Sequence, residues 1–557
     1  MNGTIIPHSY YPRPQLVRDS FISLNGDWEF SLQSSLEYRA ASENTQTIRV
    51  PFPPESALSG IGKHHSKGQI LAYRKSFAFN NESNSGRVIL HFGAVDTECA
   101  IYLNGQPVGK NEGGYIPFSF DITDKLLESN ELFVAVKDEL DVKQPYGKQT
   151  NKRGGMWYTP VSGIWQSVWL ECVPEKYITS LVIDADDKTA TVRVLGDAVA
   201  ERAVFESGEE FTFDNNECVI SFQSTKLWSP DEPNIYRFTV YAGEDSVRSY
   251  LAFRKIEIAE HRGRSKILLN GKPIIINALL DQGYFDDGLF LPETEDGYLA
   301  DIRLAKSLGF NALRKHIKIE PLLFYHLCDT EGMLVLQDMV NNGKYSFIHD
   351  TALPTVGIQR ISDKRLHKSK ESRQIFLNTM RATVELLHNS PCVVYYTIFN
   401  EGWGQFSSDE AYKILKSIDS SRIIDSTSGW FRQRLSDVDS RHIYFKALKA
   451  KHRDERPLAI SEFGGYSHRV EGHLFGKKNY GYRSFGSREE FESAFINLYE
   501  NEVIPLAKDG GYVFVYTQLS DVEDETNGLI TYDREVVKVT PEKIKAVMDK
   551  LSLIASE

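Results

Sequence analysis

The sequence predicts a multidomain protein in which two all-β domains precede a (β/α)8 barrel. Three observations support this fold class. The 557 residues are too many for one ordinary domain. Short alternating stretches broken by turn residues fill the chain up to about residue 258. After residue 259, apolar stretches alternate with helical patterns, as in a parallel barrel.

The first 172 residues favour a β-domain with tight turns. Arg87–Phe92 and Cys99–Leu103 alternate in polarity, and Asn104-Gly105 after the second stretch predicts a hairpin. Residues 173–258 contain further short strands. The segment is close in length to the ~100 residues of an immunoglobulin-like domain, and the spacing of its strands suits such a sandwich.

Residues 259–557 contain eight apolar stretches that we predict to be barrel strands. They are 274–280, 310–314, 333–337, 393–399, 422–425, 442–445, 458–461 and 512–518. A helix is expected near 295–308, where Gly309 supplies the stop, and another begins at Pro541. Continuous apolar strands suit a parallel sheet because helices cover its outer face.

Composition and charge narrow the class of partner. The chain is 41% hydrophobic and 25% charged, which is typical of a globular protein. A net charge of −12 argues against nucleic acid and anionic membranes as partners. No apolar stretch approaches the ~20 residues of a membrane span, and the N-terminus lacks the pattern of a signal peptide.

The cysteines and histidines give no sign of a metal site. Five scattered cysteines form no C-x-x-C pair, and the histidines lack H-E-x-x-H spacing. Reduced cysteines and the missing leader predict a cytoplasmic location. We expect neither a metal nor a cofactor.

Two predicted strands end in glutamate. Strand four ends in Asn400-Glu401, and strand seven ends in Ser461-Glu462. Chemistry in such barrels lies at the carboxyl ends of the strands, so both side chains should reach the same rim. Two facing carboxylates are what glycoside hydrolysis requires.

With these residues the chain resembles glycoside hydrolase family 2, which includes β-galactosidases and β-glucuronidases. The resemblance covers nearly the whole chain. It rests on Leu24–Phe30, Tyr73–Phe77, Phe92–Asp96, Tyr102–Gly105, Gly163–Gln166 and Phe253–Glu257, and in the barrel on Arg314, Asn400-Glu401 and Glu462. It implies that residues 1–172 form a jelly-roll domain of the sugar-binding type.

The resemblance implies a role for each site residue. Glu401 would be the general acid/base and Glu462 the nucleophile of a retaining mechanism. Arg314 should keep the pKa of Glu462 low, whereas desolvation and the charge of Glu462 should raise that of Glu401. Asn400 would bind the sugar 2-hydroxyl. Tyr444 would donate to Glu462, with His442 as the rival for that role.

Other residues have two interpretations each. Arg314 could be a structural partner of Asp338, and Lys315 and His316 could simply flank it. Trp403 could be a sugar platform or core. Asp281 and Asp338 could bind sugar hydroxyls or be buried partners.

Tyr516 occupies the strand-eight position where relatives often carry a sugar-stacking Trp. The basic run at 364–370 could be a substrate-side loop or a solvated face.

The sugar is less clear than the chemistry. Glucuronide-selective relatives carry an Asn-x-Lys pair shortly after strand eight, whereas residues 523–529 here are acidic and lack that lysine. A neutral sugar is therefore favoured, with galactose the commonest family substrate. A glucuronide or galacturonide stays open as the alternative.

A catalytically silent carbohydrate-binding protein is a second functional class. The presence of both Glu401 and Glu462 argues for an enzyme. The chain ends soon after strand eight, so we expect no further C-terminal domain, and the resemblance suggests a homo-oligomer.

Overall fold

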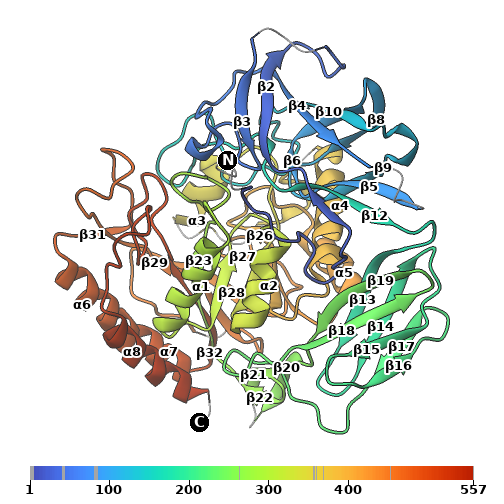
Figure 1. The fold of residues 1–557 in the computed structure, drawn as a ribbon. Coiled ribbons are helices and arrows are strands. Elements are labelled where there is room, and N and C mark those ends of the chain that lie inside the picture. Colours follow the sequence, from blue (N-terminus) through green and yellow to red (C-terminus); the bar gives the residue numbers. More distant parts are fainter. Residues whose placement is uncertain are drawn as a thin grey trace.

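The structure, a computed structural model, describes residues 6–40, 44–80, 86–261, 264–355, 358, 361–367, 369–451 and 453–555. Lys368 of the basic run lies outside the described residues. Figure 1 shows a central α/β unit with one β-rich unit at the top (blue) and another at the lower right (green).

The N-terminal unit pairs a four-stranded sheet, in the order β1-β12-β5-β9, with a six-stranded one, β3-β2-β4-β10-β7-β8. Apolar side chains of both sheets, among them Trp28 and Leu90, fill the core. The strands are β1 Phe21–Ser23, β2 Gly26–Gln33, β3 Gln46–Val50, β4 Ile70–Ala78, β5 Arg87–Phe92, β6 Val95–Asp96, β7 Glu98–Leu103, β8 Gln106–Glu112, β9 Phe118–Asp121, β10 Ser129–Lys137, β11 Gly163–Ile164 and β12 Val168–Val173.

The predicted hairpin at Asn104-Gly105 is confirmed. It joins β7 to β8, and both turn residues have positive φ, 53° and 76°. That backbone conformation is the one Asn-Gly favours between twisted antiparallel strands.

The second unit packs a three-stranded sheet, β13-β14-β17, on a four-stranded one, β16-β15-β18-β19. Its strands are β13 Ile178–Ala185, β14 Ala190–Gly196, β15 Arg202–Phe205, β16 Glu210–Thr212, β17 Glu217–Ile220, β18 Tyr236–Ala242 and β19 Asp245–Leu251. A small sheet, β20 Ile256–His261, β21 Arg264–Leu269 and β22 Lys272–Pro273, leads into the barrel.

The barrel contains eight parallel strands in the order β27-β26-β25-β24-β23-β32-β29-β28. They are β23 Ile276–Asp281, β24 Ala312–Lys315, β25 Leu334–Asp338, β26 Val393–Asn400, β27 Ile423–Ser428, β28 Asp439–Ile443, β29 Leu458–Gly464 and β32 Gly511–Thr517. Their interior and outward side chains are almost all buried. The barrel is nearly closed, and β27 and β28 are the two end strands.

Helices lie outside the strands (Figure 1). They are α1 Asp296–Ser307, α2 Leu322–Glu331, α3 Leu353–Thr355, α4 Lys370–Leu387, α5 Ser408–Ile418, α6 Arg488–Leu498, α7 Ile504–Lys508 and α8 Pro541–Ile554. A short parallel pair, β30 Tyr466–His468 and β31 Arg483–Phe485, follows β29. None of the helices in these described ranges combines the length and the apolar character needed to cross a membrane.

The predicted fold class is confirmed, and each of the eight predicted barrel strands is present. The sixth differs most in its bounds: it covers Asp439–Ile443, whereas the sequence predicts 442–445. Its first residues, Asp439-Ser440-Arg441, are polar. Asp439 forms ion pairs with Arg432 and Arg441, and Ser440 contacts Ser461 of the neighbouring strand. Tyr444 therefore follows the strand end.

One long connection of the N-terminal unit crosses to the barrel. We call residues 138–162, between β10 and β11, the docking loop. The amide of Gly343 donates to Val142 O at 2.6 Å, and the amide of Thr159 donates to Glu523 Oε1 at 2.7 Å. The loop thus contacts barrel segments after β25 and after β32, at the carboxyl ends of the strands.

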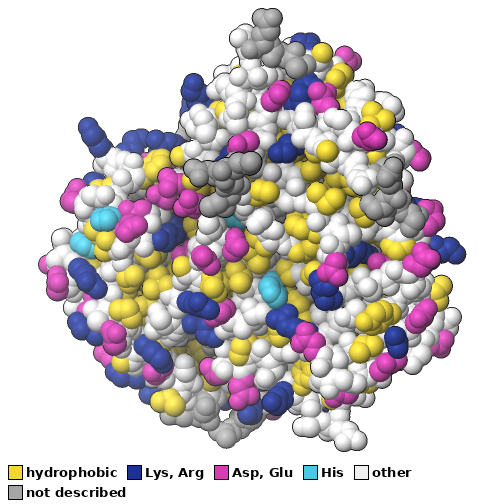
Figure 2. All heavy atoms as spheres, viewed as in Figure 1, with side chains coloured by type: hydrophobic (Ala, Val, Ile, Leu, Met, Phe, Trp, Pro, Cys, Tyr) yellow, Lys and Arg dark blue, Asp and Glu magenta, His cyan; other side chains and the backbone are white. Residues whose placement is uncertain are grey.

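The surface seen in Figure 2 carries both signs of charge. Basic side chains lie scattered among acidic ones on this face and do not gather into one stripe. Such a surface fits the net charge of −12 and offers no extended basic track on the side in view.

Candidate active site

Two glutamates lie together at the carboxyl ends of β26 and β29. Glu401 directly follows β26 in a left-handed backbone conformation (φ 54°), and its amide donates to Ser428 O at 2.9 Å. Gly402 continues the turn at φ 75°, and a side chain there would collide with the Phe431 ring. One oxygen of each glutamate and a nitrogen of His442 all lie within 4.8 Å of one another.

Glu462 is buried and surrounded by donors. Its side chain is 7% exposed; Arg314 Nη1 donates to Oε1 at 3.1 Å and Tyr444 OH donates to Oε2 at 2.8 Å. Burial alone would raise its pKa, but interactions with His442 and Arg314 outweigh this and lower the pKa to about 2. Glu462 is therefore held as a carboxylate.

Arg314, fully buried on β24, connects several site residues. Its Nε donates to Asp338 Oδ1 at 2.9 Å, and its Nη2 donates to Asn400 Oδ1 at 2.8 Å. Nη1 also donates to the backbone oxygen of Ser461 at 2.7 Å. Arg314 is thus a partner of both Asp338 and Glu462. Its bond to Asn400 turns the amide oxygen inward and the NH₂ group away from the guanidinium.

Asp338 lies between two donors. Its second oxygen contacts His316 Nδ1 at 2.6 Å. Burial, followed by the nearby charge of Lys148, lowers the pKa of His316 to about 4 despite the neighbouring Asp338. Asp338 and His316 therefore border the site, and both oxygens of Asp338 are already engaged by protein.

Glu401 has a more open position than Glu462. Its side chain is 25% exposed, and His442 Nδ1 contacts its Oε1 at 2.8 Å. The same nitrogen lies 3.5 Å from Glu462 Oε2. Because Tyr444 donates to Glu462 at 2.8 Å, the geometry gives His442 a different partner, Glu401.

Two aromatic residues lie elsewhere than expected. Tyr516 is fully buried among Phe463, Phe495 and Tyr499, on the outer side of β32. This corrects the placement of Tyr516 at the sugar-stacking position of strand eight: adjacent residues of a strand face opposite sides, and it is Thr517 whose Oγ1 contacts Tyr444 OH at 2.8 Å.

Trp403 is only 5% exposed, and its indole donates to Gly343 O at 3.0 Å. Its ring packs against Tyr146 and Trp157 of the docking loop and against Tyr345. Little of its surface is left for a sugar, so Trp403 packs chiefly against the docking loop. Trp157 and Tyr345 are only half-buried beside it.

Asp281 is a buried ion-pair partner. Lys315 Nζ lies 2.5 Å from its Oδ2 and also binds Glu320 at 2.9 Å. This arrangement favours the structural interpretation of Asp281 and Lys315. The basic run shows Lys364 and Lys370 exposed, and His367 bonded to Ser372 Oγ at 3.0 Å.

The docking loop supplies site residues that sequence reasoning missed. Tyr158 OH donates to Glu525 Oε2 at 2.6 Å, and Gln518 Nε2 donates to the same oxygen at 2.9 Å. Burial raises the pKa of Glu525, Lys148 opposes this, and Glu462 adds to it. The charges of Glu525 and Lys148 therefore act on Glu462, whereas Glu523 is engaged by the loop backbone.

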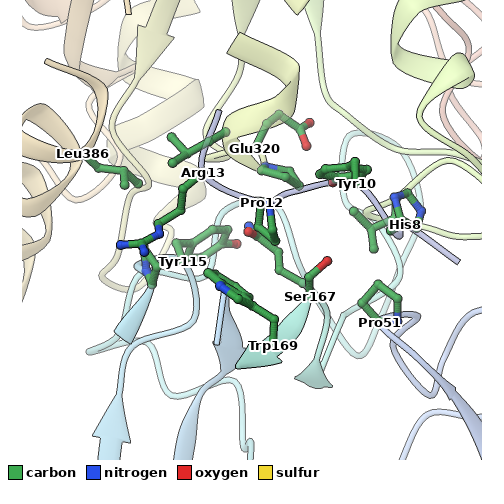
Figure 3. A pocket seen from close by; sticks show the side chains of 16 residues that line it. His8, Tyr10, Pro12, Arg13, Pro51, Tyr115, Ser167, Trp169, Glu320 and Leu386 are labelled. Carbon is green, nitrogen blue, oxygen red and sulfur yellow. The ribbon is translucent and has the colours of Figure 1, made fainter. Parts of the chain in front are cut away.

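A separate cavity of about 80 Å³ lies between the N-terminal segment, the first β-unit and the barrel (Figure 3). Its lining includes His8, Arg13, Trp169 and Glu320, and neither Glu401 nor Glu462. It is a gap between packed units, apart from the two glutamates.

Glu401, His442 and Glu462 are also the one His/Cys/Asp/Glu group, in the described part of the chain, close enough to share a metal ion. Their contacting atoms already pair with one another or with Tyr444 and Arg314. Such a donor arrangement suits proton transfer and carboxylate chemistry.

Three family models match the chain. "Glycosyl hydrolases family 2, TIM barrel domain" matches residues 261–549, the family's galactose-binding domain-like model matches 65–163, and "Glycosyl hydrolases family 2" matches 178–254.

Individual relatives are similar at low identity. A β-galactosidase from Thermoanaerobacter pseudethanolicus is 25% identical over 57% of this chain and 46% of its own. The chain spans about half, or less, of the first curated relatives it matches. A β-glucuronidase from an uncultured Clostridium sp. has the same fold, with a TM-score of 0.74, 18% identity and coverage of 96% of this chain and 99% of that one. A β-galacturonidase from Eisenbergiella tayi gives a TM-score of 0.71 at 17% identity, with 98% of each chain covered.

Proposed function

The chain belongs to glycosyl hydrolase family 2, and on that premise we propose that it is a retaining, exo-acting β-glycoside hydrolase. The nucleophile would be Glu462 and the acid/base Glu401. The substrate would be a small glycoside or oligosaccharide, and no cofactor is needed for this chemistry.

The observation that carries the proposal is the unequal pair of glutamates. In retaining enzymes the two carboxyl groups lie about 5–5.5 Å apart, and here their nearest oxygens lie within 4.8 Å. Glu462 is buried against Arg314 and Tyr444, which suits an ionised nucleophile. Glu401 is more exposed, which suits a group that must reach the leaving oxygen and later water.

The reaction would proceed in two steps. Glu462 attacks the anomeric carbon while Glu401 gives its proton to the glycosidic oxygen, and a covalent glycosyl-enzyme forms. Water then attacks that carbon, and Glu401 removes the proton of the water. Tyr444 would stabilise the Glu462 carboxylate as it departs, and the Asn400 NH₂ would bind the sugar 2-hydroxyl.

A neutral β-galactoside is our first choice of substrate. It rests on the acidic residues after β32 and on the β-galactosidase names among the relatives. Of that acidic stretch, Glu525 lies near Glu462, so an anionic sugar would meet its charge.

A β-glucuronide or β-galacturonide is the second candidate. Lys148 favours it, because its positive charge acts on Glu462, Glu525 and His316 and would attract a sugar carboxylate. The solved structures named as a glucuronidase and a galacturonidase agree with this candidate, but their similarity to this chain shows only a shared fold.

A panel of p-nitrophenyl β-glycosides tests the proposal. Galactoside, glucoside, glucuronide and galacturonide would be compared at equal concentration, with the α-galactoside as the matched control of configuration. We expect turnover of β-substrates only, and NMR should detect the β-anomer of the sugar first. Release of the α-anomer first would contradict retention, and binding without turnover would indicate a carbohydrate-binding protein.

Replacing Lys148 separates the two sugars. Lys148→Met should lower kcat/KM for a uronide by about 10-fold or more, the loss of one charged hydrogen bond. It should leave a galactoside nearly unchanged. An equal change of kcat/KM for the uronide and the galactoside would show that Lys148 does not select the sugar.

A further inference from the structure

His442 is the side chain that touches both glutamates, and the proposed mechanism gives it no task. It lies on β28, between β27 and β29, and its side chain is fully buried. Its Nδ1 lies 2.8 Å from Glu401 Oε1 and 3.5 Å from Glu462 Oε2. Its other nitrogen, Nε2, lies 2.9 Å from Ser428 Oγ.

Three serines continue from His442 to a buried aspartate. Ser428 Oγ donates to Ser461 Oγ at 2.9 Å, and Ser461 Oγ lies 2.6 Å from Ser440 Oγ. Ser440 lies near the carboxyl group of Asp425, which is 1% exposed. We call Asp425, Ser440, Ser461 and Ser428 the serine chain.

The direction of the serine chain fixes the proton on one nitrogen of His442. Ser428 donates its hydroxyl proton to Ser461 Oγ at 2.9 Å, and a serine hydroxyl has only one proton to donate. The proton of Ser428 is then used, and its oxygen must accept from His442 Nε2. Nε2 carries a proton, and Nδ1 is the nitrogen left to exchange one with Glu401.

The surroundings hold the imidazole in this orientation. Gly429 has a φ of 86°, and a Cβ there would lie 2.6 Å from the ring carbon Cγ of His442. The Trp430 ring packs at 5.6 Å on another side. The ring therefore has a space shaped for it, and the Glu401 contact is not a chance approach of a mobile side chain.

We propose that His442 is a positioning residue that shares the transferable proton of Glu401, with the serine chain selecting its tautomer. The inference rests on the proposed glycosidase function. Before the first step the Glu401–His442 pair holds one proton in its contact, either on the carboxyl group or on Nδ1. It loses that proton to the glycosidic oxygen and regains one from water in the second step, so protons balance over the cycle.

Several other charged or titrating groups face this pair, and the pH dependence belongs to all of them. They are Glu462 on β29, Arg314 on β24, Asp425 on β27, Tyr444 after β28, Tyr480 and Tyr482 before β31, Asp350 in the segment 347–352, and Lys148 of the docking loop.

His442→Asn tests the shared proton. Asn can place an amide near Oε1 of Glu401 but cannot carry the proton. We expect the alkaline limb of kcat/KM to move to lower pH, because the transferable proton then has one carrier in place of two. The loss of kcat/KM should be about 10-fold or more for an alkyl glycoside and small for a dinitrophenyl glycoside, which needs no acid. An unmoved limb with equal loss on both substrates would show a purely structural role.

Ser428→Ala tests the serine chain without touching the Glu401 side chain. We expect the same direction of shift, but smaller. Ser467→Ala is the matched control, because Ser467 is also buried and bonds another serine, Ser484, at 2.8 Å. An equal shift in the control, or none in Ser428→Ala, would refute the chain.

A measurement on the wild-type protein needs no activity. In ¹⁵N-histidine NMR, the His442 resonances, identified by their loss in His442→Asn, should show a protonated Nε2 at every pH where the protein is folded. A protonated Nδ1 with a bare Nε2 would overturn the proposal even if hydrolysis is found, whereas failure of the glycoside panel alone would overturn only the proposed function.

Discussion

Removing the charge of Arg314 should bring the titration of Glu462 into a measurable range. In the wild type the pKa of this carboxyl is about 2, against an ordinary value of 4.5, so activity should show no acid limb due to Glu462 above about pH 4. Arg314→Gln leaves Glu462 buried with His442 as its main remaining counter-charge. A new acid limb of kcat/KM should appear.

The size of the shift follows from the same figures. The fall of the pKa from 4.5 to about 2 corresponds to about 3 kcal/mol in favour of the carboxylate. Arg314 is the second of the two main contributors after His442, and burial works against both. Losing Arg314 should therefore raise the pKa of Glu462 well above its wild-type value.

Stability should follow the same sign. A depressed carboxyl pKa stabilises the fold above the unfolded pKa of 4.5, and that contribution is lost as pH falls toward 2. In Arg314→Gln this contribution should be smaller, so the free energy of unfolding should fall less between pH 4.5 and pH 2 than it does in the wild type.

The assay is the initial rate on an activated aryl glycoside between pH 3.5 and 8, with circular dichroism at each pH. Arg314→Lys keeps the charge and should keep the limb low, although it loses the fork that binds Asp338 and Asn400. Arg534→Gln is the matched control, since Arg534 pairs with Asp301 at 3.2 Å and not with Glu401 or Glu462. If folded Arg314→Gln shows the same pH profile as the wild type, the electrostatic account of Glu462 is wrong.

Three further outcomes test the roles of single residues. Glu462→Gln should abolish turnover by several orders of magnitude, because no anion is left to form the glycosyl-enzyme; a residual rate of more than a few per cent would be incompatible with its role. Glu401→Ala should cost roughly 10²–10⁴-fold on alkyl glycosides and much less on dinitrophenyl glycosides, with added azide giving a β-glycosyl azide; an equal loss on every substrate and no azide product would place the acid elsewhere. Tyr444→Phe removes a 2.8 Å bond to a carboxylate and should slow hydrolysis by roughly 10–100-fold, whereas Tyr482→Phe, which keeps the ring stacked on Tyr444 at 3.9 Å, should have a small effect.

Local patterns predicted the barrel well. Each strand is a short apolar stretch between turn or helix residues, and parallel strands bring their carboxyl ends to one rim. Glu401 and Glu462 could therefore be paired from sequence alone. The predicted sixth strand begins three residues too late because Asp439-Ser440-Arg441 is polar. The partners that allow these residues to be buried, Arg432 for Asp439 and Ser461 for Ser440, lie outside the strand.

Contacts between distant segments could not be predicted in this way. The docking loop has no periodicity that indicates a partner, and its place over the barrel depends on the packing of two whole units. The sequence leaves Trp403 as a sugar platform or a core residue, and the side chains that cover it, Trp157 and Tyr146, belong to the docking loop. Tyr516 and Thr517 differ by one position, and a slip of one residue moves a side chain to the other face of a strand.

β27 and β28, the two end strands of the barrel order, meet along a seam that should open more easily than the other strand pairs. At its lower end the amide of Asp437, just before β28, donates to Ile424 O of β27 at 2.9 Å. At its upper end Ser428 of β27 contacts His442 of β28 at 2.9 Å, and Ser461 of the neighbouring β29 contacts both Ser428 and Ser440 of β28. A barrel whose two end strands are held together mainly by side-chain contacts should separate at this seam first on warming or in mild denaturant. Since Glu401 and Glu462 stand at the upper end of that seam, we expect them to separate while most of the barrel is still folded, so that inactivation precedes global unfolding.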